Sequence, residues 1–231
     1  MAAAASDPVP VTTPTTAVTG PSPLAGKTVV VIGGASGIGK STAVAVRAAG
    51  ARVIITGRND ATLAAAKAEI LARAGGSDDD VVTASFDASD ADAVEAFFAE
   101  HEAGSIHHLV CTAGPSNGTS SLEGRGGLEG LRAQLSMKLM AQLTPVSLGA
   151  AKLADGGCVV LTSGVLSVRP GKGSPALAMA NGALEIAARG LANDLGPRLR
   201  CCCVSPALTN TELWSKMPAA AREGMLSGFG A

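Results

Sequence analysis

Short apolar runs rich in β-branched residues alternate with alanine-rich helical stretches along most of the chain. The runs are continuously apolar, which is typical of parallel strands covered on both faces. Strands are predicted at 28–33, 52–57, 81–86, 107–113, 158–163 and 200–205. Helices are predicted between them near 38–49, 60–74, 90–103, 128–153 and 175–195, with Gly50, Gly104 and Gly196 where helices should end. This order predicts an α/β protein with a doubly wound parallel sheet in three αβα layers.

Residues 1–23 show neither a helical nor an alternating apolar pattern and are rich in Ala, Pro and Thr. This composition is typical of a flexible leader, so we expect a single folded domain over 24–231. The leader lacks the basic start and continuous apolar core of a secretory signal, and its first basic residue is Lys27. We therefore expect a cytoplasmic protein, with an atypical organelle-targeting segment as the alternative.

Composition narrows the classes of partner. The net charge is −1 with a pI near 6.3, which gives no electrostatic reason to expect nucleic acid or an anionic membrane. No stretch of about 18 apolar residues is present, so we expect no transmembrane helix. Three of the five cysteines are consecutive, at 201–203, and the cysteines do not pair with the histidines in a metal-site spacing. We expect reduced thiols and no metal site.

The run VVVIGGASGIGKSTAVAV at 29–46 fits two phosphate-binding loops. GASGIGKS has the spacing of a P-loop, which holds nucleoside triphosphates, and would use Lys40. Starting at Gly33, the same letters give the glycine spacing of a dinucleotide-binding turn at a helix N-terminus, as in the Rossmann fold. A P-loop protein normally also has a strand ending in Asp, and here only Asp87 directly follows a predicted strand. The dinucleotide interpretation is favoured, and the P-loop NTPase remains an alternative.

From Leu24 almost to its end, the sequence resembles the short-chain dehydrogenase/reductase family. The glycine turn, FDASD around Asp87, CTAG at 111–114 where the family usually has NNAG, and SPALTNT at 205–211 carry the resemblance. The resemblance implies an oxidoreductase of a carbonyl or alcohol that binds a nicotinamide dinucleotide. The implied cofactor-binding residues are Gly33, Ser36, Gly37, Ile38, Gly39, Arg58, Asp87, Ala113, Gly114, Asn181, Pro206 and Thr211.

The choice of cofactor depends on the end of the second predicted strand. An acidic side chain there would bind the ribose 2′-hydroxyl and repel a 2′-phosphate. This sequence has Gly57 followed by Arg58, whose guanidinium is suited to phosphate. NADP(H) is therefore the expected cofactor, with a solvated surface arginine as the alternative.

The catalytic motif departs from the family pattern, because the chain contains no Tyr. Alignment places Leu177 where the family has its catalytic Tyr, Asn181 where it has the Lys four residues later, and Gly164 where it has Ser. Ser163 precedes that last position, and Lys138 stands where the family has Asn. Compared with the family pattern, the Asn amide and the Lys ammonium have thus exchanged positions. Lys138, Ser163 and Asn181 are the candidate catalytic residues, with Lys138 as a possible proton donor or a plain surface lysine.

Two further expectations follow from the resemblance. A protein that keeps the nucleotide site without catalysis, as a sensor or interaction partner, is the main alternative to an enzyme. The resemblance implies another helix and strand after the last residue of this sequence, so we expect either a shortened form of the domain or an edge supplied by another subunit. The strand at 201–204 would then be an exposed apolar edge, so we expect a homo-oligomer, a dimer or tetramer.

Overall fold

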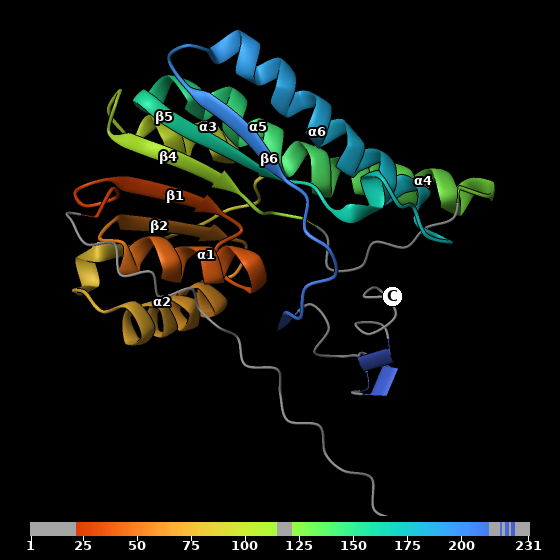
Figure 1. Ribbon diagram of the computed structural model, residues 1–231, viewed down its shortest axis with the longest axis horizontal. Coiled ribbons are helices and arrows are strands. Elements are labelled where there is room, and N and C mark those ends of the chain that lie inside the picture. The colour runs from red at the N-terminus through yellow and green to blue at the C-terminus, as the bar shows by residue number, and fades with distance from the viewer. Residues whose placement is uncertain (1–21, 115–121, 213–217, 219, 222, 225–231) are drawn as a thin grey trace, which may run out of the picture.

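The computed structural model describes residues 22–114, 122–212, 218, 220–221 and 223–224 (Figure 1). Most of the predicted leader, part of the segment after β4 and most residues after 212 lie outside these ranges. Statements about the structure below concern the described residues.

Six parallel strands form one sheet in the order β3-β2-β1-β4-β5-β6. They are β1 (Thr28–Ile32), β2 (Arg52–Gly57), β3 (Val81–Ser85), β4 (Ile106–Cys111), β5 (Leu153–Thr162) and β6 (Arg200–Val204). Every neighbouring pair is parallel. The doubly wound parallel sheet predicted from the apolar runs is confirmed.

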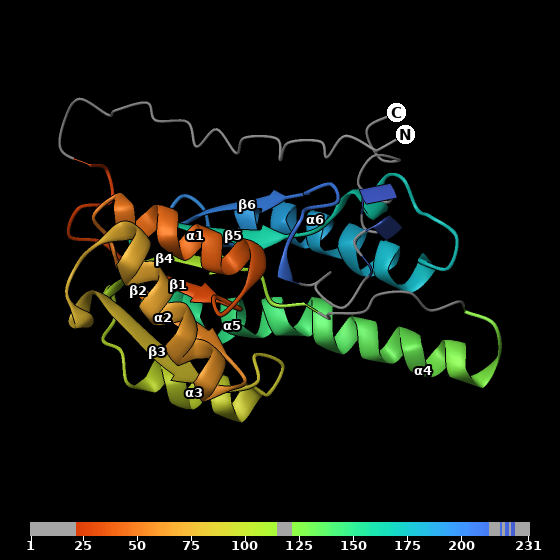
Figure 2. The ribbon, with the colours of Figure 1, turned by 90° about the horizontal axis from the view of Figure 1, so that it is seen from below.

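Helices cover both faces of the sheet, which gives the three predicted layers (Figure 1). α1 (Gly37–Ala48) and α2 (Asp60–Ala74) pack on one face, where Val29, Val31, Leu63 and Ile70 form a core cluster. α3 (Ala91–Ala99), α5 (Ala141–Gly149) and α6 (Pro175–Leu195) pack on the other. The larger cluster on that face includes Phe97, Phe98 and Leu184. α4 (Gly124–Gln134) precedes α5 and projects past the sheet (Figure 2).

The helix predicted at 128–153 is not one continuous α-helix. A π-helical segment, η2 (Leu135–Met140), separates α4 from α5, and a 3₁₀ turn at Ala150–Lys152 follows α5. β5 then begins at Leu153, before the predicted start at 158. Short π segments inside helices are frequent at functional sites, because the wider turn redirects one or two side chains. Here that segment contains Lys138.

Short 3₁₀ turns complete the secondary structure. They are η1 (Asp78–Asp80), η3 (Ala150–Lys152) and η4 (Val165–Ser167). η4 lies shortly after the end of β5 in the chain.

Candidate cofactor and active site

The glycine turn joins β1 to α1, and its close contacts require glycine. Gly33 has a φ of +83°, and a Cβ atom there would lie 2.8 Å from the backbone nitrogen of Ala113. A Cβ atom on Gly39 would lie 2.2 Å from the carbonyl oxygen of Gly33. The missing side chains let the N-terminus of α1 approach the ends of β1 and β4. This is the close approach that a bound pyrophosphate needs.

The turn lies where the strand order reverses, between β1 and β4. In open α/β sheets ligands bind in the crevice at this switch point. The Thr112 hydroxyl donates hydrogen bonds to the carbonyl oxygens of Ile32 (2.9 Å) and Gly33 (3.2 Å). Thr112 therefore ties the end of β4 to the start of the turn. Nothing in the sequence around Thr112 predicts this role.

Arg58 and Asp87 follow the adjacent strands β2 and β3, as the sequence predicts. The Asp87 carboxylate accepts hydrogen bonds from the Ser89 hydroxyl (2.7 Å) and backbone nitrogen (2.9 Å). These bonds, followed by the nearby positive charge of Arg58, lower the pKa of Asp87. The carboxylate is thus held ionised at the end of β3, beside an exposed guanidinium.

Gln142 joins the ends of β4 and β5, close to the candidate catalytic residue Lys138 in sequence. Its side chain is fully buried. Its amide nitrogen donates to the carbonyl oxygens of Ala113 (3.1 Å) and Thr162 (2.9 Å), and its amide oxygen accepts from the Thr162 backbone nitrogen (2.8 Å). This side chain fixes the spacing between the ends of β4 and β5. Sequence reasoning missed it, because an isolated Gln in a helix has no local signature.

Lys138 extends from the π-helical segment toward the end of β5. Its Nζ atom donates to the carbonyl oxygen of Ser163 at 3.2 Å. Its stem packs on Gly114, where a Cβ atom would lie 3.1 Å from Lys138 Cδ. Burial lowers the pKa of Lys138 to about 8. An ammonium in this setting can exist in both protonation states near neutral pH.

Asn181 reaches the same turn from α6. It is 3% exposed, and a Cβ atom on Gly164 would lie 3.0 Å from its Nδ2 atom. Its Oδ1 atom is buried and has no hydrogen-bond partner among the described residues. The exchange of amide and ammonium inferred from the sequence therefore brings both groups to the turn formed by Ser163 and Gly164.

The Ser163 hydroxyl is directed toward α6. It donates to Glu185 Oε1 at 2.7 Å and lies 3.1 Å from the carbonyl oxygen of Asn181. The Ser167 hydroxyl also donates to Glu185 Oε1, at 2.6 Å. These hydrogen bonds lower the pKa of Glu185, and the one from Ser167 has the largest effect. The backbone carbonyl of Ser163, rather than its hydroxyl, contacts Lys138. Sequence reasoning did not identify Glu185.

Of the remaining predicted residues, Ser36, Ile38 and Thr211 border the glycine turn, and Pro206 lies beside η4. Ser36 caps α1 in an extended conformation, and Ile38 lies in its first turn. Thr211 packs on Gly37, with its Cβ atom 3.4 Å from where a Gly37 Cβ would be. The carbonyl oxygen of Pro206 accepts from the backbone nitrogen of Val165 at 2.9 Å, which holds the segment after β6 against η4.

Lys40, which the P-loop interpretation would place at a phosphate, is engaged by carboxylates. Its Nζ atom lies 2.6 Å from Glu69 of α2 and 2.6 Å from Glu212. The sheet order is that of a dinucleotide-binding Rossmann fold. Both observations favour the dinucleotide interpretation of the loop.

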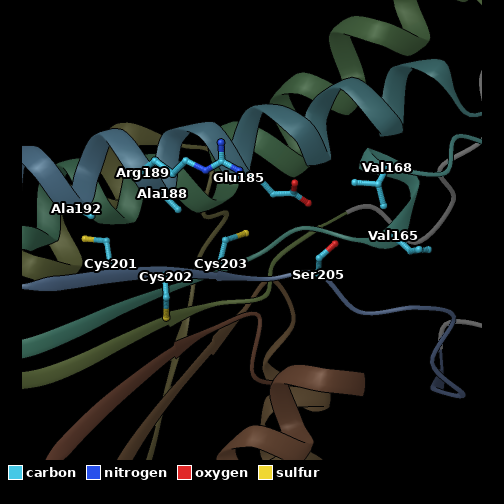
Figure 3. Close-up of a pocket in the computed structure, with 10 residues that line it drawn as sticks. All are labelled: Val165, Val168, Glu185, Ala188, Arg189, Ala192, Cys201, Cys202, Cys203 and Ser205. Atoms are coloured by element: carbon cyan, nitrogen blue, oxygen red, sulfur yellow. The ribbon is translucent and has the colours of Figure 1, made fainter.

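A groove of about 560 Å³ lies at the outer edge of the sheet, between β6 and α6. Cys201 and Cys203 point toward α6, and Cys202 points to the opposite side of the strand (Figure 3). This groove is separate from the glycine turn. All five cysteines are free thiols. Within the described ranges there is no cluster of three or more potential metal ligands and no helix able to span a membrane.

Comparisons with known proteins agree with this geometry. Residues 33–227 match the family model described as Enoyl-(Acyl carrier protein) reductase. A solved dehydrogenase/reductase from Sinorhizobium meliloti 1021 is 28% identical, with 87% of this chain and 79% of that chain covered and a TM-score of 0.75. A short chain dehydrogenase from Burkholderia cenocepacia J2315, solved in complex with NADP, is 28% identical over 87% of this chain and 82% of that chain, with a TM-score of 0.72.

A short-chain type dehydrogenase/reductase from Mycobacterium ulcerans shares the fold at 24% identity, with 87% and 72% of the two chains covered and a TM-score of 0.75. A search of curated proteins found no match.

Proposed function

Because the chain belongs to the short-chain dehydrogenase/reductase family, we propose that it binds NADP(H) and transfers hydride between the nicotinamide and a carbonyl or alcohol substrate. The observation that carries this proposal is the glycine turn at the switch point of the sheet. A Cβ atom on Gly33 or Gly39 would clash with the backbone of Ala113 or of Gly33, so this close turn requires glycine, as a dinucleotide-binding turn does. The similar chain from Burkholderia cenocepacia was solved with NADP, which supports the same cofactor class.

Arg58 is the residue proposed to favour NADP(H) over NAD(H). It follows β2, and its charge acts on Asp87 at the end of β3. A guanidinium at this position attracts the 2′-phosphate, whereas a carboxylate would repel it. Arg58→Glu should reverse the ratio of NADPH to NADH affinity measured by calorimetry. Arg132→Glu makes the same change of charge on α4 and should leave the ratio as it is. An unchanged ratio in the Arg58 variant would refute this role.

Proton transfer is assigned to Lys138. A bound NADPH would supply the hydride for reduction of the carbonyl carbon. The carbonyl oxygen then needs a proton, which Lys138 Nζ donates, and the neutral amine is reprotonated from water. Burial holds the pKa of this ammonium near 8, so at pH 7 it is mostly protonated and acidic enough to act as a donor. The Ser163 carbonyl oxygen accepts a hydrogen bond from this ammonium and orients it.

Two variants of Lys138 test this assignment on a panel of small aldehydes and ketones with NADPH. Wild-type reduction should fall as the pH rises through about 8, because the donor loses its proton. Lys138→Met should lower turnover by roughly 10²-fold, the lower range for general acid catalysis, and remove that pH dependence. Lys138→Arg should keep the positive charge but not the proton transfer. Equal turnover in the wild type and the Met variant would end the assignment.

A non-catalytic nucleotide-binding protein is the second candidate. It is favoured by the absence of Tyr from the chain and by the Ser163 hydroxyl, which donates to Glu185. Under this alternative NADPH binds, yet no carbonyl in the panel is reduced at any pH, and Lys138→Met changes nothing but the local stability. Turnover that depends on Lys138 would exclude it.

A further inference from the structure

The carboxylate of Glu212 lies at the N-terminus of α1. Its Oε2 atom accepts a hydrogen bond from the backbone nitrogen of Gly37 at 2.8 Å. Its Oε1 atom lies 2.6 Å from Lys40 Nζ. The preceding residue, Thr211, packs on Gly37. The segment at 210–212 is therefore held across the glycine turn by a backbone contact, an ion pair and a side-chain contact.

The first turn of α1 offers no other anion to its own backbone N–H groups. Ser36 caps the helix without a side-chain hydrogen bond, and the first turn contains no acidic residue. Helix N-termini carry a partial positive charge and unpaired N–H groups, which attract a carboxylate or a phosphate. Glu212 satisfies this requirement from a distant part of the chain. The bound dinucleotide would satisfy the same requirement with its pyrophosphate.

We infer that Glu212 is an internal competitor for the pyrophosphate of the dinucleotide, so that its carboxylate must leave the N-terminus of α1 when the cofactor binds. This inference rests on the proposed function, because it supposes that the turn is the cofactor site. It adds an autoinhibitory contact to that site.

The competing carboxylate stays charged under all ordinary conditions. The hydrogen bond from Lys40, followed by backbone hydrogen bonds, lowers the pKa of Glu212 to about 2. The contact therefore does not switch off between pH 5 and 9. The Glu212 carboxylate therefore stops competing with the pyrophosphate when it moves away, and not by becoming protonated.

The contact is weak enough to open. The Glu212 side chain is 51% exposed, so solvent screens its interaction with Lys40 and limits the cost of breaking it. A hollow of about 380 Å³ borders Gly37, Lys40 and Glu212, which gives the side chain room to move. If the closed state is modestly favoured, the apparent affinity is reduced by the fraction of molecules that are open. Removal of the carboxylate should therefore tighten NADPH binding by roughly three- to tenfold.

The test is the dissociation constant of NADPH, measured by calorimetry on the full chain without any substrate. Glu212→Ala should bind NADPH about three- to tenfold more tightly than the wild type. Glu69→Gln is the matched control, because it removes the other carboxylate that contacts Lys40 and leaves Glu212 on Gly37. It should stay within about twofold of the wild type. Thermal melting shows whether each variant folds.

A second ligand separates competition for the pyrophosphate from a general change in the site. Adenosine 2′-monophosphate carries the 2′-phosphate but no pyrophosphate, so Glu212→Ala should bind it with wild-type affinity. Unchanged or weaker NADPH binding by the Ala variant would overturn the inference, and weaker binding would identify Glu212 as a positioning residue instead. Failure of folded wild type and variants alike to bind NADPH would refute the proposed function and the inference with it.

Discussion

Replacement of Gln142 by Leu tests the framework that holds the candidate site. Leu has nearly the same volume, so the change removes hydrogen bonds and leaves little cavity. The lost bonds are those to the carbonyl oxygens of Ala113 and Thr162 and the one from the Thr162 backbone nitrogen. The Thr162 N–H group is then buried without this partner, at a cost of about 1–3 kcal/mol. The carbonyl oxygens lose less, because each has a second lone pair.

Together these losses should lower the free energy of unfolding by about 2–4 kcal/mol, because Gln142 is fully buried. For a domain of this size the melting temperature then falls by roughly 5–12 °C, measured by differential scanning calorimetry. Ser105→Ala is the control, since it removes the exposed hydrogen bond from Ser105 to the Glu102 carbonyl oxygen. It should change the melting temperature by less than about 2 °C. A Gln142→Leu protein that melts like the wild type would refute the reasoning.

Three further predictions concern other parts of the molecule. Gly39→Ala should abolish measurable NADPH binding in calorimetry, because the new methyl would lie 2.2 Å from a carbonyl oxygen of the turn; Gly190→Ala, with no atom within 4 Å of the added Cβ, should bind like the wild type. Iodoacetamide should modify exposed Cys202 first and buried Cys111 last, since burial raises the pKa of the Cys111 thiol; mass spectrometry that finds Cys111 alkylated in the folded protein would contradict this. Because its pKa is lowered from 4.5 to about 2, Glu212 contributes stability above pH 4.5 that is lost as the pH falls toward 2, so thermal melting of Glu212→Gln should depend less on pH in that window.

The strands could be predicted from the sequence because each is a continuous apolar run between helical stretches. The exception is β5, whose true start at Leu153 was missed. Asp155, Gly156 and Gly157 interrupt the apolar pattern there, and the register with β4 shifts in the same region. Gly156 has a φ of +77°, so the chain bends within the strand. A pattern of apolar positions does not reveal such an irregularity.

The helix at 128–153 was mispredicted for a related reason. A π turn adds one residue without changing the composition of the helix, so η2 leaves no mark in the apolar pattern. Pro145 lies inside α5, where it lacks a backbone N–H group for the hydrogen bond of the preceding turn. From η2, Lys138 reaches the carbonyl oxygen of Ser163, a contact that alignment alone did not establish.

The sequence alone locates the local features of the candidate site, and it does not locate contacts between distant segments. The glycine turn is encoded within a few residues, Arg58 directly follows β2, and Asp87 lies just beyond β3. Gln142 and Glu212 act on residues far away in the sequence, and neither has a local signature. Glu212 could have been suspected only from its position beside Thr211.

The turn from Gly33 to Gly39 is proposed to bind NADP(H), and parallel calorimetric titrations of the folded protein with NADPH, NADH and ATP measure this binding. NADPH should bind more tightly than NADH, and ATP should bind weakly or not at all. Binding of ATP alone would revive the P-loop interpretation, and a folded protein that binds none of the three would show that the turn is not a cofactor site.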